Sequence, residues 1–235
     1  MNVINQERLK EIESLTLKAG NGITLDTACV MQMVSYVADE SMTDHPKCAC
    51  PILTRYAIQL NDRFNNNHRQ LLKPFIPLLV GTRADDTTQI ARKRLIMWRN
   101  VTATYPLLLD LLKLSDIANS LRGLQNTEQD MHAAAELLLM NKEKIQKTAY
   151  AYADANAYAS ANAYASAYAD ANAYASAYAY VNAYADANAY ASAYAYANAY
   201  ADAYASASAK KLREELVKVS LETLRMAIEV KCDLP

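Results

Sequence analysis

Glycine and proline are scarce in this chain, with four Gly and six Pro among 235 residues. No glycine follows Gly123, and no proline lies between Pro106 and Pro235. Tight strand turns usually need the backbone conformations that these two residues supply. Their absence therefore disfavours a β structure in the second half of the chain. Four glycines also leave no glycine-rich phosphate loop, so nucleotide hydrolysis is not expected.

The chain also lacks a strong net charge and a long apolar run. Its 24 basic and 25 acidic residues give a formal net charge of −1, which removes the electrostatic argument for nucleic acid or an anionic membrane as a partner. No apolar run approaches the length of a membrane span, and Met1–Asn5 does not resemble the start of a secretory signal. The four cysteines are then expected to be reduced thiols, and we expect a cytoplasmic protein.

What the chain has in abundance is an alternating repeat at Ala149–Ala209. Every odd position is Ala except Val181, and every even position is Tyr, Asn, Asp or Ser. The acidic residues recur at intervals of sixteen and define the period of the repeat: Asp154, Asp170, Asp186 and Asp202. A period of this kind indicates a repeat architecture, a helical array or a tolerated spacer written by expansion of a short DNA repeat.

Three interpretations compete for the repeat: a β-solenoid, a helix and a disordered segment. Strict alternation is typical of β-strands, and a sixteen-residue unit could form one rung of a β-solenoid. Alanine, however, is the best helix former, and a helix needs neither the Gly nor the Pro corners that a solenoid would use. We therefore predict an all-α fold, with the β-solenoid as the alternative for the repeat.

The pattern of apolar residues, caps and breakers divides the chain into four segments. We predict an N-terminal helical domain at 1–123, a connecting helix at 124–148, the repeat at 149–209 and an amphipathic helix at 210–235. Within them, Pro51 suits the first turn of a helix, Asp85, Asp86 or Thr87 can cap another, and Pro106 is expected to bend or end it. Thr127 is expected to begin a helix that leads toward the repeat.

One group of motifs carries a resemblance. They are His45-Pro46 with Cys48 and Cys50-Pro51, Leu60-Asn61-Asp62, Ile76-Pro77, Gly81-Thr82-Arg83, and Arg69, Arg92 and Arg94. This string resembles a family of uncharacterised proteins of tailed phages and bacteria over roughly residues 23–114. The resemblance implies a helical domain followed by an Ala-rich helical segment, in a protein that acts in a bacterial cytoplasm. It implies no activity and no catalytic residue.

The loop before Pro51 has the most unusual chemistry. His45, Cys48 and Cys50 place three possible zinc ligands within six residues, which is one ligand short of a structural zinc site. Cys29, His68 or Asp44 could supply the fourth. No second ligand pair follows, so we favour the interpretation that the cysteines pack as small apolar residues and that no metal or other cofactor is bound. A nucleophilic cysteine assisted by His45 or His68 is disfavoured because no motif fixes such a geometry.

A basic cluster forms the second candidate site, and its members are Arg83, Arg92, Arg94 and Arg99. Arginines near a helix start could bind a phosphate or carboxylate group of a ligand. The alternative is a solvated helix face with ion pairs to nearby aspartates.

The third candidate is the set of tyrosines in the repeat, which we expect to mediate self-association and represent by Tyr164, Tyr174, Tyr184 and Tyr194. We predict a non-enzymatic helical interaction protein that forms a homo-oligomer through this repeat and binds a host protein or a small ligand. An inhibitor of a host defence system belongs to this class. The alternatives are a structural repeat protein of solenoid or fibrous type, and a zinc- or thiol-dependent enzyme built on the His45–Cys50 loop.

Overall fold

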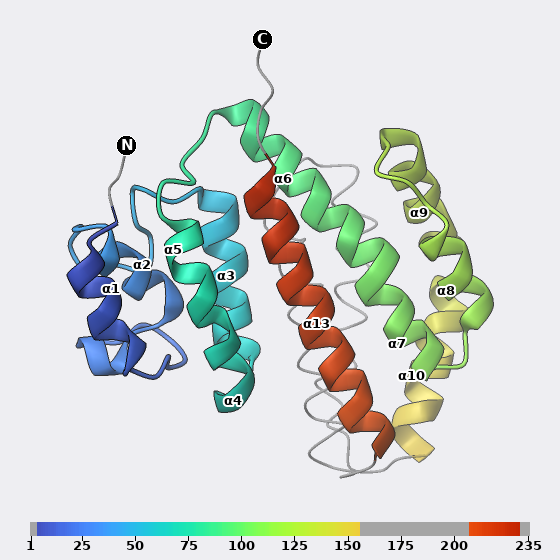
Figure 1. Ribbon diagram of the computed structural model, residues 1–235. Coiled ribbons are helices and arrows are strands. Elements are labelled where there is room, and N and C mark those ends of the chain that lie inside the picture. The colour runs from blue at the N-terminus through green and yellow to red at the C-terminus, as the bar shows by residue number, and fades with distance from the viewer. Residues whose placement is uncertain (1–3, 156–206, 231–235) are drawn as a thin grey trace. The chain divides into compact units, whose positions relative to one another are not determined.

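The computed structural model describes residues 4–155 and 207–230 (Figure 1). Every regular element in these two ranges is a helix, so the predicted all-α fold is confirmed and the β-solenoid alternative is not supported. The described ends of the repeat are helical, because Lys142–Ala155 forms α10 and Ala207–Glu229 forms α13. The remainder of the repeat, including Tyr164, Tyr174, Tyr184 and Tyr194, lies outside the described residues.

The chain divides into two compact units. The first combines Met1–Leu95 with Ser220–Pro235, and the second is Ile96–Val219. Two helices run through the boundary, namely α6 (Asp86–Arg99) and α13. The first unit therefore contains two segments that are separated in the sequence by the whole second unit.

The first unit is built around α2 (Val30–Val37), whose residues are nearly all buried. A helix that is buried on nearly all sides requires neighbours on those sides. The elements that it contacts most are α1, α3 and α5. The other elements of this unit are α1 (Gln6–Glu13), η1 (Leu25–Thr27), α3 (Pro51–Arg63), α4 (Asn66–Arg69), η2 (Gln70–Phe75) and α5 (Ile76–Leu79).

Local sequence sets several helix starts. Pro51 occupies the first turn of α3, where its missing N–H costs nothing, as predicted. Asp85 precedes α6 and accepts a hydrogen bond from the Thr88 N–H at 2.8 Å. That backbone hydrogen bond stabilises the charged carboxylate and lowers the pKa of Asp85. The two prolines after Lys73, Pro74 and Pro77, lie in the short elements η2 and α5.

The second unit has its own apolar core. Its elements after α6 are η3 (Asn100–Thr104), α7 (Tyr105–Leu111), α8 (Ser115–Arg122), α9 (Glu128–Met140), α10 and the first part of α13. Leu109, Ile117, Leu121 and Leu138 belong to one buried cluster, against which Ile145 of α10 packs. Thr127 caps α9 by accepting from the Asp130 N–H, so the predicted helix start at Thr127 is confirmed.

The last part of α13 completes the first unit. Ser220, Thr223, Leu224 and Ala227 are fully buried and recur at helical spacing. No helix in the described part of the chain is long and apolar enough to cross a membrane.

Candidate functional site

The Asp44–Cys50 loop separates its three candidate ligands. The side chain of His45 is 73% exposed, and its Nδ1 pairs with an Asp44 carboxylate oxygen at 2.8 Å. Cys48 and Cys50 are buried, at 2% and 0% exposure. The imidazole therefore faces solvent while both thiols belong to the protein interior.

Backbone hydrogen bonds fix this loop. The Glu40 carboxylate accepts from the N–H groups of Lys47 and Cys48, at 2.7 and 2.8 Å. On the other side, the Arg83 N–H donates to the Cys48 carbonyl at 2.9 Å, and the Cys50 N–H donates to the Thr82 hydroxyl at 3.1 Å. The loop is thus held by its own backbone against the turn that precedes α6. Cys48 and Cys50 thus take part, through their backbone groups, in holding the loop in place.

Two of the residues considered as a fourth zinc ligand, Cys29 and His68, pack against other parts of the fold. Cys29 is buried at the start of α2, and burial raises the pKa of its thiol. A raised pKa disfavours the thiolate, which is the form that binds metal or attacks a substrate. The His68 ring lies edge-on to Phe64, with ring centroids 6.4 Å apart. Within residues 4–155 and 207–230, no group of three His, Cys, Asp or Glu side chains is arranged to hold a metal ion.

We predict that this loop folds without zinc. Purified protein should contain substoichiometric zinc, and a chelator should leave its Tm unchanged. Replacing the exposed ring by His45→Ala should change the free energy of unfolding by no more than about 0.5 kcal/mol. Metal analysis and thermal unfolding measure both. Stoichiometric zinc that is lost together with folding on chelation would contradict the prediction.

The arginine cluster is divided by the structure. Arg92 is buried, and its guanidinium donates to three carbonyls: Thr82 at 2.6 Å, Ala227 at 3.1 Å and Val230 at 3.3 Å. Two of these acceptors lie at the C-terminal end of α13, where unpaired carbonyls carry partial negative charge. Arg92 therefore connects α6 with the turn at Thr82 and with α13. Its guanidinium uses its hydrogen bonds on backbone carbonyls rather than on an external ligand.

The other three arginines have different environments. Arg83 and Arg94 belong to the first unit and are exposed. Arg99 belongs to the second unit, and its Nε atom is buried. Among the four predicted binding residues, Arg83 and Arg94 are the two whose exposure suits contact with an external group.

Asn61 and Arg69 form a buried polar junction that the sequence analysis did not assign as a site. The Asn61 amide accepts from the Val30 N–H at 3.2 Å and donates to the Lys18 carbonyl at 2.8 Å. Arg69 donates to the carbonyls of Asn61 and Phe64, each at 2.6 Å, at the end of α3. Both residues belong to the motif string that carries the resemblance. In this chain the contacts of both residues stabilise the fold.

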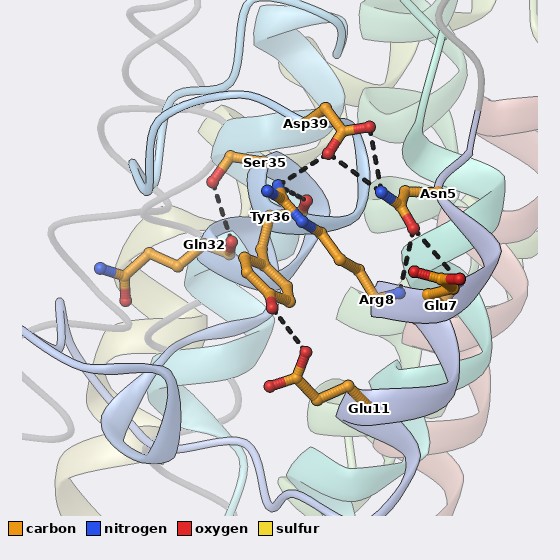
Figure 2. A network of polar contacts seen from close by, with 8 residues as sticks. All are labelled: Asn5, Glu7, Arg8, Glu11, Gln32, Ser35, Tyr36 and Asp39. Atoms are coloured by element: carbon orange, nitrogen blue, oxygen red, sulfur yellow. Dashed lines mark hydrogen bonds and ion pairs between the residues drawn. The ribbon is translucent and has the colours of Figure 1, made fainter.

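A half-exposed network fastens α1 to the end of α2 (Figure 2). Arg8 pairs with Asp39 at 2.9 Å, donates to the Tyr36 carbonyl at 2.9 Å, and lies 4.6 Å from the centre of the Tyr36 ring. Asn5 caps α1 and donates to the same Asp39 carboxylate. The Tyr36 hydroxyl donates to Glu11 at 2.5 Å, and this hydrogen bond raises the pKa of Tyr36. The phenol is thus stabilised in its protonated form, which suits a structural contact.

The chain matches no protein-family model, no curated protein and no solved structure. The resemblance to proteins of tailed phages and bacteria remains a prediction from the motifs.

Proposed function

We propose that this protein is a non-enzymatic helical interaction protein that self-associates through its Ala/Tyr repeat. The observation that carries the proposal is the structure at the two ends of the repeat. The helix α10 continues into the repeat as far as Ala155, and α13 begins within it at Ala207. The repeat is therefore inserted between two helices of the folded part of the chain.

Both flanking helices are anchored in a core. Ile145 of α10 packs against the apolar cluster of the second unit. Leu224 and Ala227 of α13 are fully buried, and Arg92 binds the carbonyls at its C-terminal end. A segment with anchored ends pays less conformational entropy when it associates than a segment with one free end.

The composition of the repeat suits contact between chains. It contains 14 of the 17 tyrosines in the sequence, and four Asp are its only charged residues. Tyrosine presents a large apolar face and a polar tip at a low cost in side-chain entropy, and alanine allows helix backbones to approach closely. Exposed apolar surface is unfavourable in water, so a segment of this composition is expected to favour association.

The placement of the reactive side chains supports a role without catalysis. Cys29, Cys48 and Cys50 are buried, and Arg92 is hydrogen-bonded to backbone carbonyls. These residues stabilise the fold in the positions that they occupy. The motif resemblance adds a bacterial host protein, or a small ligand, as the class of further partner, and Arg83 and Arg94 are the exposed cations that could contact it.

Replacing four repeat tyrosines by serine should weaken the oligomer. We expect the full chain to sediment as a dimer or larger species at micromolar concentration. The combined change of Tyr164, Tyr174, Tyr184 and Tyr194 to Ser should raise the dissociation constant at least about tenfold, equivalent to about 1.4 kcal/mol. Sedimentation velocity over a concentration series measures this constant.

A matched control changes four asparagines of the same repeat, Asn162, Asn172, Asn182 and Asn198, to Ser. This variant keeps the tyrosines and should associate as the unchanged protein does. A chain that remains monomeric at all concentrations, or equal dissociation constants for the two variants, would contradict the proposal.

A further inference from the structure

One continuous helical path runs from α6 through η3 to α7, and its middle turn is a π-helix. The Tyr105 N–H donates to the Asn100 carbonyl, five residues earlier, in place of the usual four. The cause is in the sequence. Pro106 has no N–H to donate to Thr102, and its ring would crowd the Thr102 carbonyl in a regular α-helix. The wider turn relieves this crowding, and such turns frequently occur at functional sites.

Two polar side chains on this turn are buried without a hydrogen-bond partner in the part of the chain that the structure describes. Asn100 and Thr104 are each 1% exposed. The unpaired atoms are Nδ2 and Oδ1 of Asn100 and Oγ1 of Thr104. The two residues are four apart, so they lie on the same side of the helix. Their neighbours Val101 and Tyr105 belong to the apolar core of the second unit.

The neighbouring polar residue of the turn is different. The Thr102 hydroxyl donates to the Trp98 carbonyl at 2.9 Å, which is the ordinary contact of a threonine within a helix. A buried polar side chain on this turn can therefore find a partner within the helix, as Thr102 does, whereas Asn100 and Thr104 do not. An unpaired buried polar group costs stability, and nearly all such groups in native proteins have a partner in the protein or in ordered water.

We propose that Asn100 and Thr104 form an internal binding site for an ordered water molecule. The amide offers N–H donors and an acceptor oxygen, and the hydroxyl can donate or accept, so a water bound between them would have up to three partner atoms. Buried waters typically make two to four such bonds. All three atoms belong to neutral groups, which suits water rather than an ion. This site is independent of the proposed self-association, because it lies on η3 in the described part of the second unit.

The test is magnetisation transfer between water and the side-chain amide of Asn100 in the full-length, isotopically labelled protein. The unchanged protein should show direct cross-relaxation from a water that stays bound longer than the protein takes to tumble. Its absence would overturn the proposal, whatever the variants do.

Two threonine variants sharpen the test. Thr104→Val preserves the shape of the side chain but removes one partner of the water, so the cross-relaxation should be lost and the Tm should fall by about 2–4 °C. Thr102→Val is the matched control on the same turn, and the water signal should persist in it. A Thr104→Val protein at least as stable as the unchanged one would show that the hydroxyl has no bound partner, and would also overturn the proposal.

Discussion

Arg92→Met should lower the free energy of unfolding of the first unit by about 3 kcal/mol, because hydrogen bonds to a charged group contribute about 1.5–3 kcal/mol each and are not additive. The change keeps most of the buried stem but removes all three donors. The carbonyls of Thr82, Ala227 and Val230 then lose the guanidinium that binds them. The corresponding fall in Tm is roughly 6–12 °C for a chain of this size.

Hydrogen exchange can locate the effect of this change. Amides of the last turns of α13 should exchange faster in Arg92→Met, because the end of this helix is no longer bound to α6. Arg92→Lys should also be destabilised, since one ammonium group cannot reproduce the planar fork of donors. Arg94→Met, at an exposed position of the same helix, is the matched control and should stay within about 0.5 kcal/mol of the unchanged protein. Equal stability of Arg92→Met and Arg94→Met would contradict the structural role of Arg92.

Leu224→Ala should lower the free energy of unfolding by about 2–5 kcal/mol, the range for truncating a fully buried leucine. Leu224 is 0% exposed, and it lies in the part of α13 that belongs to the first unit. The change removes apolar contacts and leaves a cavity, although the residue is more than one hundred positions from the start of α6. Denaturant unfolding followed by circular dichroism measures the loss.

Glu229→Ala provides the control on the same helix, because Glu229 is exposed and its truncation should have little effect. A chain with two compact units need not unfold in a single step, so hydrogen exchange should accompany the denaturation curve. In Leu224→Ala, faster exchange should include amides of α2 and α3, which belong to the same unit. Exchange that changes only within α13 would show that the C-terminal helix is not part of that core.

Much of the fold could be predicted from local sequence. The scarcity of Gly and Pro favoured helices, and every regular element among the described residues is a helix. The predicted helix starts at Pro51 and Thr127 are confirmed. These features depend on residues within one turn of each other, and short-range physical chemistry is what a sequence displays directly.

The candidate sites, in contrast, depend on packing between segments that are distant in the sequence. The spacing of His45, Cys48 and Cys50 is compatible with ligands on one side of a loop, but the fold places the imidazole in solvent and the thiols in the interior. Arg92 and Arg94 are two residues apart, yet one is buried and the other exposed. Which side of a helix becomes covered depends on what packs against it, and that partner can come from anywhere in the chain.

The helix irregularity at Pro106 depends partly on local sequence and partly on tertiary packing. The sequence predicts that it bends or ends a helix, and the structure shows a π-turn through which the helix continues as α7. The missing N–H is a local fact and requires some irregularity at this position. Continuation of the helix depends on the apolar core that packs against Val101, Tyr105 and Leu109.

The sequence by itself determined the helical class, several caps and the position of the irregular turn, because propensity, capping and the missing proline donor act over a few residues. Only the tertiary structure decided that the last part of α13 returns to the first unit, that Arg92 binds its final carbonyls, and that Asn100 and Thr104 are buried together. Burial is a property of all the segments that meet at one place. No single segment contains that information, since the same side chain is stable in water or in a core according to the partner that covers it.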